Sequence, residues 1–145
     1  MRIHFISIGG SIMHSLAIEL KRNGHFISGS DDIIYEPAKS NLIKNNLLPN
    51  EEGWVINRIT DDLDLVILGM HAKLDNPELL EAKRKNISIL SFPEFIYNYS
   101  QHKKRIVIAG SHGKTSITAM IIHVLKLHSI KVDYLVGAQT DLIKN

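Results

Sequence analysis

Short apolar runs alternate with stretches of helical spacing along the first hundred residues. The runs predict buried strands at residues 3–8, 26–28, 65–68 and 87–90. The stretches between them predict helices at residues 12–22, 36–45, 93–99 and from Asn76 onward. Asn76 is suited to cap its helix, because Pro77 follows at the first helical position and Glu78 lies in the first turn. Strands that alternate with helices predict an α/β fold with a parallel sheet and helices on both faces.

A second pattern begins after the polar segment 100–104. It predicts a strand at 106–109, a helix at 115–128 and the start of another strand at 132–136. One helix between two strands does not make a finished sheet. We therefore expect a first domain over residues 1–100 and, over 104–145, the opening of a second domain whose remainder is absent from this sequence.

Composition excludes several classes of protein. Of 145 residues, 44% are hydrophobic and 22% are charged, which is typical of a globular chain. The absence of cysteine excludes disulfides and thiolate metal sites. A net charge of +2 is too small to indicate nucleic-acid binding. No apolar run approaches the roughly 20 residues that span a bilayer. We expect a cytoplasmic protein without membrane or nucleic-acid partners.

The segment Gly110-Ser111-His112-Gly113-Lys114-Thr115 lies between a predicted strand and a predicted helix. It matches the second half of a phosphate-binding P-loop, in which backbone N–H groups and a helix N-terminus face phosphate oxygens. A lysine at position 114 would reach the β- and γ-phosphates, and Thr115 would bind Mg²⁺. The full signature requires a further glycine at position 108, where this chain has Ile108. An ordinary turn with a surface lysine is the alternative.

A second glycine loop, Gly9-Gly10-Ser11, follows the first predicted strand. Of the three glycines in a dinucleotide-binding fingerprint, only the central one is present there. A ligand-binding loop and a purely structural turn are therefore equally good interpretations of this segment. Asp31 follows the second strand, where an acidic residue often meets a ribose hydroxyl. His71 follows the third strand and is either a ligand contact or a loop residue.

Six segments together resemble the Mur ligases of peptidoglycan synthesis, and the resemblance covers the whole chain. They are I-G-G-S at 8–11, G-S-D at 29–31, L-G-M-H-A at 68–72, D-N-P-E-L at 75–79, S-F-P-E at 91–94 and G-S-H-G-K-T at 110–115. The last segment is the form of P-loop typical of this family, which accounts for the missing glycine. The G-M-H-A and S-F-P-E segments look more like the branch that attaches L-alanyl-γ-D-glutamyl-meso-diaminopimelate to UDP-N-acetylmuramate. The branch that adds L-alanine is the alternative.

The resemblance implies a Rossmann-like domain for a UDP-sugar, followed by the start of a P-loop ATPase domain. It also implies an ATP-dependent carbon–nitrogen ligase that joins an amino acid or peptide to UDP-N-acetylmuramate through an acyl phosphate. The implied UDP-sugar contacts are Gly9, Gly10, Ser11, Ser30, Asp31 and His71. The implied ATP contacts are Gly110, Ser111, His112, Gly113, Lys114, Thr115 and Ser116, with Lys114 catalytic and Thr115 on Mg²⁺.

These 145 residues end about forty residues into the central domain that the resemblance implies. We therefore expect the chain alone not to catalyse ligation, and we expect its partner to be the remainder of the ligase. The residues that select the amino acid or peptide would lie beyond Asn145. Two other functional alternatives are a nucleotide-binding module without catalysis and an unrelated P-loop ATPase whose N-terminal half is a regulatory appendage.

Overall fold

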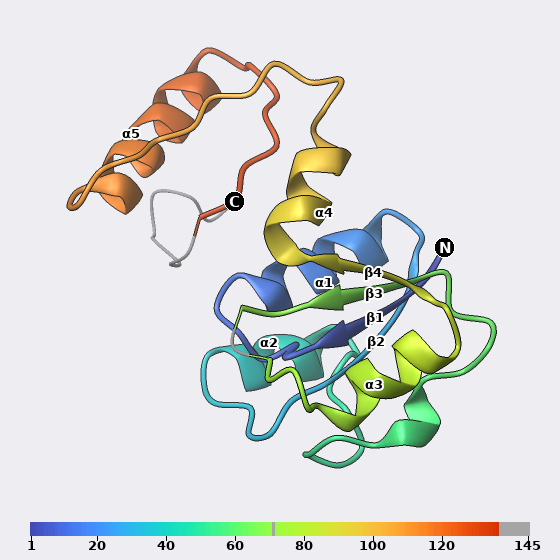
Figure 1. Ribbon diagram of the computed structural model, residues 1–145. Helices are drawn as coiled ribbons and strands as arrows, with labels where there is room; N and C mark the ends of the chain where they lie inside the picture. Colours follow the sequence, from blue (N-terminus) through green and yellow to red (C-terminus); the bar gives the residue numbers. More distant parts are fainter. Residues whose placement is uncertain (71, 137–145) are drawn as a thin grey trace. The chain divides into compact units, whose positions relative to one another are not determined.

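The computed structural model describes residues 1–70 and 72–136 (Figure 1). It divides the chain into two compact units, Met1–His102 and Lys103–Asn145. This division falls within the polar segment where the sequence predicts a domain boundary. The identity of each unit as a UDP-sugar domain or an ATPase domain stays a prediction. The two units are described separately below.

The first unit is built on a parallel sheet of four strands, as the sequence predicts. They are β1 (Arg2–Ile6), β2 (Phe26–Ser30), β3 (Leu65–Leu68) and β4 (Ser88–Ser91). Their order in the sheet is β2-β1-β3-β4, and every neighbouring pair is parallel. The chain thus adds β2 on one side of β1 and then returns to add β3 on the other side.

Helices cover both faces of this sheet (Figure 1). They are α1 (Met13–Arg22), α2 (Ala38–Lys44), α3 (Pro77–Arg84) and α4 (Phe92–Tyr99). Ile3 and Phe5 pack in the core that contains α1, α2 and Phe95 of α4. Ile6 packs in a second core with Leu79 and Ala82 of α3. The alternation of side chains along β1 therefore separates the two cores.

Side-chain caps fix the starts of two helices. The Asn76 side-chain oxygen accepts hydrogen bonds from the N–H groups of Glu78 and Leu79, at 2.9 and 3.1 Å. This confirms the predicted cap of α3. Before α4, Ser91 and Glu94 form a reciprocal capping box, which the sequence analysis did not predict. The α3 cap follows the loop after β3, and the α4 cap directly follows β4. Both caps therefore fix how the chain leaves the carboxyl ends of these strands.

The second unit contains α5 (Lys114–Leu127) within its described residues, 103–136. The helix agrees with the prediction, but the strands expected at 106–109 and 132–136 are wrong, because both segments are irregular. A strand requires a hydrogen-bonded neighbour, and apolar composition alone does not supply one. A side-chain hydrogen bond from Lys103 to Asp133 joins the segments before and after α5.

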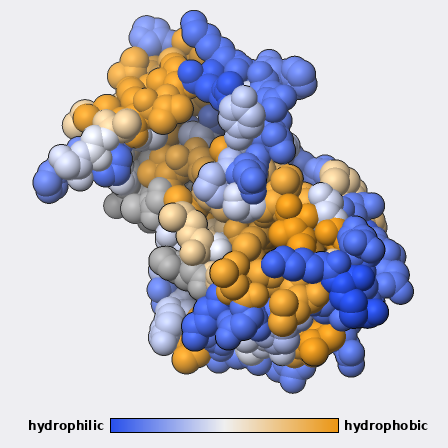
Figure 2. All heavy atoms as spheres, viewed as in Figure 1, coloured by the Kyte–Doolittle hydropathy of each residue, from blue (hydrophilic) through white to orange (hydrophobic). Residues whose placement is uncertain are grey.

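Several apolar side chains of α5 face solvent. Met120 is 61% exposed and Leu127 is 71% exposed, and Figure 2 shows hydrophobic atoms gathered over this helix. Ala119 and Ile122 are the side chains of α5 that are buried. Even so, none of the helices in the described part of the chain is long and apolar enough to cross a membrane.

Candidate functional site

All four strands of the first unit end at the same edge of the sheet, because they are parallel. The loops after β1 and β3 leave this edge as neighbours, and the N–H of Gly69 donates to the carbonyl of Ile6 at 2.9 Å. The strand order reverses between β1 and β3. Open α/β sheets bind their ligands at such a switch point, beyond the carboxyl ends of the strands. The predicted glycine loop, residues 9–11, lies at this position.

Backbone hydrogen bonds hold the start of the glycine loop. The N–H groups of Ser7 and Ile8 both donate to the carbonyl of Ser30, at 2.9 and 3.0 Å. Ser7 adopts φ = 71°, so a serine rather than a glycine takes the left-handed conformation in this turn. Among the described residues, the N–H groups of Ser11, Ile12 and Met13 donate no hydrogen bond. They are free to bind an anion at the start of α1.

Asp31 lies directly against this loop. Its Oδ2 accepts a hydrogen bond from the N–H of Gly9 at 2.7 Å, and its Oδ1 accepts one from the N–H of Asp32 at 2.9 Å. Burial raises the pKa of the Asp31 carboxyl above its ordinary value of 3.8, although these two hydrogen bonds oppose the shift. The structure therefore brings Asp31 and the glycine loop together. The predicted contact with a ribose stays a prediction.

Ser30 was expected to contact the UDP-sugar, but its side chain does not face the edge of the sheet at which the strands end. Its side chain is fully buried, and its hydroxyl donates to Glu78 Oε1 at 2.6 Å and accepts from Arg58 at 2.8 Å. The expectation that Ser30 lines a sugar site is corrected on this ground. Side chains at residues 28 and 30 of β2 point to the face that α3 covers, so the hydroxyl joins a buried polar network instead.

The centre of that network is the carboxylate of Glu78, with no exposed surface. Besides Ser30, it accepts from the backbone N–H of Val55 at 2.8 Å and lies 3.3 Å from the Nε2 of His4, which is also fully buried. The other ring nitrogen of His4 is 2.8 Å from the Ser28 hydroxyl. Val55 donates to Glu78 of α3 and Arg58 donates to Ser30 of β2, so the network attaches the segment 51–58 to α3 and to the sheet.

Burial by itself would raise the pKa of Glu78, but hydrogen bonds from His4, Ser30 and Val55 outweigh it and lower the pKa below the ordinary 4.5. A carboxylate with a lowered pKa in the folded state stabilises the fold at pH values above its unfolded pKa. We therefore expect the free energy of unfolding to fall as the pH drops below about 4.5.

Urea unfolding across a pH series measures this effect, with Glu78→Gln for comparison. Asp62, Glu81 and Glu94 also have lowered pKa values and contribute to the same trend. The difference between the two proteins therefore isolates Glu78. Identical pH dependence in both would contradict the role given to this carboxylate.

The second predicted loop, residues 110–113, leads directly into α5. Gly113 is the N-cap residue of the helix and has φ = 74°, a backbone conformation that residues other than glycine rarely adopt. No side chain caps α5, and Ile117 makes the first helical hydrogen bond, to the carbonyl of Gly113 at 2.9 Å. Among the described residues, the N–H groups of 114–116 have no acceptor. This loop therefore also presents donors to an anion.

Lys114 folds back over the loop that precedes it. Its Nζ donates to the carbonyl oxygens of Gly110 and Ser111, at 2.6 and 3.3 Å. The side chains of Ser111 and His112 are exposed and close together, with 3.2 Å between Oγ and Nδ1. Thr115 is half-buried and Ser116 exposed, both in the first turn of α5. The structure thus collects these predicted residues around one helix N-terminus.

Sequence reasoning missed His4, Glu78 and Arg58. The motif D-N-P-E marked Glu78 only as a favourable residue of a first helical turn. The signal that was available is the polar His4 in an otherwise apolar strand. His71 lies outside the described residues. No cluster of three or more potential metal ligands occurs in the part of the chain that the structure describes.

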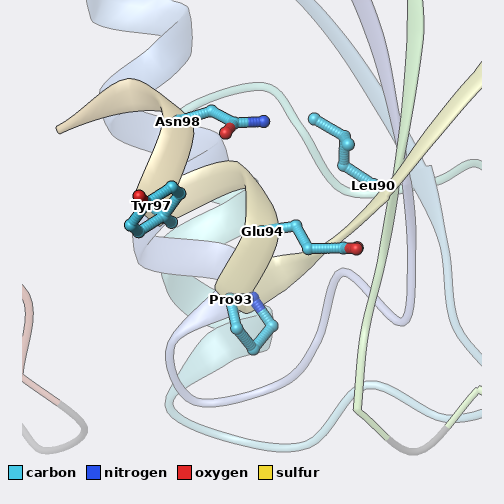
Figure 3. A pocket seen from close by; sticks show the side chains of 5 residues that line it. All are labelled: Leu90, Pro93, Glu94, Tyr97 and Asn98. Carbon is cyan, nitrogen blue, oxygen red and sulfur yellow. The ribbon is translucent and has the colours of Figure 1, made fainter. Parts of the chain in front are cut away.

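A pocket lies between β4 and α4, and none of its lining residues belongs to a glycine loop. Figure 3 shows its lining, which is formed by Leu90, Pro93, Glu94, Tyr97 and Asn98. The carboxylate of Glu94 is held by the backbone N–H and hydroxyl of Ser91, at 2.8 and 2.6 Å. Its polar group therefore serves the helix start, and the pocket takes no part in the candidate site.

Comparison with known proteins connects this fold to a family. A family model described as "Mur ligase family, catalytic domain" matches residues 2–104. The UDP-N-acetylmuramate–L-alanine ligase of Clostridium beijerinckii is 37% identical over 146 residues, which cover 98% of this chain and 30% of that protein. This chain thus spans about 30% of the length of the curated relatives it matches.

Two solved structures have the same fold. A ligase from Neisseria meningitides, which joins UDP-N-acetylmuramate to L-alanyl-γ-D-glutamyl-meso-diaminopimelate, matches with a TM-score of 0.87 and 26% identity over 99% of this chain and 44% of its own. The UDP-N-acetylmuramate–alanine ligase of Thermotoga maritima matches with a TM-score of 0.75 and 30% identity over 89% of this chain and 30% of its own. Together with the family match over most of its length, these likenesses show that the chain belongs to the Mur ligase family.

Proposed function

We propose that the first unit binds UDP-N-acetylmuramate, with the diphosphate on the N–H groups that follow Gly9. One observation carries the proposal: the loop after β1 has N–H groups without acceptors among the described residues and lies at the switch point of the sheet. The chain belongs to the Mur ligase family, which supports a sugar nucleotide as the ligand. The relatives are named for ligases acting on this sugar nucleotide. Gly10 and Ser11 would contact the phosphates and Asp31 a ribose hydroxyl. His71 is retained as a proposed contact.

We propose that the loop 110–116 begins an ATP-binding domain. The residues present fit such a group, because the free N–H groups of 114–116 and the Lys114 ammonium meet at one helix N-terminus. Thr115 offers the hydroxyl that P-loops place on Mg²⁺. Bound ATP and Mg²⁺ supply the phosphoryl group and the charge neutralisation for its transfer. Lys114 would leave the Gly110 carbonyl and donate to a phosphate oxygen instead.

The proposed reaction of the whole ligase is ATP-dependent amide formation. The muramoyl carboxylate is activated as an acyl phosphate, the amine of an amino acid or peptide attacks its carbonyl carbon, and phosphate leaves. Both branches of the family in the comparisons share UDP-N-acetylmuramate and differ in the incoming amine. The glycine loop therefore supports the shared substrate. An assay of the whole ligase with L-alanine and with the tripeptide decides the amine.

Isothermal titration of the 145-residue chain with UDP-N-acetylmuramate tests the proposal. We expect saturable binding, and weaker binding of UDP-N-acetylglucosamine, which lacks the lactyl carboxylate. ATP should not displace the sugar nucleotide, since the two proposed sites lie in different units. A chain that is folded by circular dichroism yet gives no saturable heat with UDP-N-acetylmuramate would contradict the proposal.

A valine at position 9 should weaken this binding at least tenfold, or about 1.4 kcal/mol. A Cβ at Gly9 would lie 2.9 Å from Asp31 Oδ2 and 3.2 Å from two carbons of Ile34, so the loop would have to move. Glu19→Val is the control, because Glu19 is exposed on α1 and lies outside the loop. Equal affinity of Gly9→Val and the unchanged chain would mean that the loop is merely a turn.

A further inference from the structure

His14 lies in the first turn of α1, directly beneath the glycine loop, and only 3% of it is exposed. Its Nδ1 is 2.8 Å from the carbonyl oxygen of Gly10, and its backbone N–H donates to the same oxygen at 3.1 Å. Its Nε2 lies 3.4 Å from the side-chain nitrogen of Asn41 and 3.5 Å from the Ser15 hydroxyl. A buried imidazole is thus committed to one carbonyl of the loop.

These contacts determine which ring nitrogen carries the proton. A carbonyl oxygen can only accept, so the Nδ1 of His14 must donate to Gly10. The Nε2 of a neutral ring is then an acceptor, which suits the amide group that Asn41 presents from α2. The ring is therefore held from both sides, by the loop at one nitrogen and by α2 at the other.

The carbonyl of Gly10 belongs to the same peptide plane as the N–H of Ser11. Glu36-Pro37 is the cis bond among the described residues, so the Gly10–Ser11 peptide is trans. In a trans peptide, C=O and N–H point in opposite directions. Drawing the Gly10 oxygen inward onto His14 therefore turns the Ser11 N–H outward. Ser11 is exposed, and this N–H has no acceptor among the described residues.

We infer that His14 is a positioning residue, which aims the Ser11 N–H at the diphosphate of the sugar nucleotide. The inference rests on the proposed function of the glycine loop. His14 itself contacts no ligand. Its imidazole fixes the orientation of one donor before the ligand arrives, which reduces the ordering that binding would otherwise require. Asn41 extends this support to α2.

A pair of amide substitutions separates this role from simple packing. In His14→Asn, the side-chain NH₂ lies where Nδ1 was and can donate to Gly10. In His14→Gln, the NH₂ lies nearer the Nε2 position. Both variants are polar and smaller than the ring, so a packing role predicts that the two lose affinity together. We expect UDP-N-acetylmuramate to bind His14→Gln at least tenfold more weakly, and His14→Asn within about threefold of the unchanged chain.

The ¹H–¹⁵N resonance of Ser11 gives a second readout. It should shift on titration of the unchanged chain and of His14→Asn, and much less in His14→Gln. Equal affinities of Asn and Gln variants, or a Ser11 shift that is the same in both, would overturn the inference. If the unchanged chain does not bind UDP-N-acetylmuramate, the proposed function fails and this inference fails with it. If either variant is unfolded, His14→Ser, with a short donor, and His14→Ala form the replacement pair, for which the same outcomes apply.

Discussion

Replacing Glu78 with alanine is expected to lower the free energy of unfolding by about 3–5 kcal/mol, because buried hydrogen-bond donors lose their acceptor and the shortened side chain leaves a cavity. The carboxylate that disappears accepts from Ser30 and Val55 and lies against His4. The side chains of His4 and Ser30 cannot turn to water, because both residues are fully buried. Their lost hydrogen bonds add to the cavity that the shortened side chain leaves.

Urea unfolding followed by fluorescence measures this loss. The single tryptophan, Trp54, packs against the core on the α3 face and reports on this region. Glu19→Ala is the matched control, since Glu19 lies on the exposed side of α1 with a 3.8 Å ion pair to Arg22. It should change stability by less than about 0.5 kcal/mol. A Glu78→Ala chain as stable as this control would show that the network contributes nothing to the fold.

Replacing Lys114 with alanine should reduce ATP-dependent ligation on the order of 10²–10³-fold, as the loss of one preorganised charge-stabilising donor does elsewhere. The assay needs a whole ligase. A chimaera of the Clostridium beijerinckii L-alanine ligase, with this chain in place of the matching 30% of that protein, provides one. The ammonium of Lys114 would meet the phosphate charge that grows as the phosphoryl group is transferred.

Phosphate release by the chimaera, with and without the substitution, gives the measurement. Lys131→Ala is the control, because Lys131 is an exposed lysine of the same unit outside the loop. Affinity for UDP-N-acetylmuramate should stay unchanged in both variants. A Lys114→Ala chimaera that retains full activity would contradict the P-loop assignment, and loss of sugar-nucleotide binding as well would indicate misfolding.

Features that depend on neighbours in sequence were predictable. Asn76 caps α3 through N–H groups two and three residues away, and Gly113 precedes α5 as the glycine pattern indicated. The four strands of the first unit were found for a related reason: each is an apolar run of a length typical of buried strands. The ends of the strands were predicted less accurately. The first strand was expected to reach Ile8, but β1 ends at Ile6, because Ser7 takes a positive φ.

Features that depend on distant residues could not be predicted. The contact of His4 with Glu78 joins residues 74 positions apart and requires both the register of β1 and the docking of α3. The resemblance to the Mur ligases implied that Ser30 contacts the ligand, but its hydroxyl points inward and donates to Glu78, 48 positions away in the chain. Residues 106–109 are apolar enough for a strand, but pairing partners cannot be deduced from composition.

The strand order has a consequence for how this chain acquires its fold during synthesis. β1 pairs with β2 across 24 residues, as from Ile3 to Ile27, but with β3 only across 62, as from Ile3 to Leu65. The β1–α1–β2 unit can therefore form first, with the other edge of β1 open until residues 65–68 leave the ribosome. An apolar strand with an open edge pairs readily with other chains. We therefore expect the nascent chain to be most prone to aggregation while residues 31–64 are emerging from the ribosome, and the emergence of β3 ends that period.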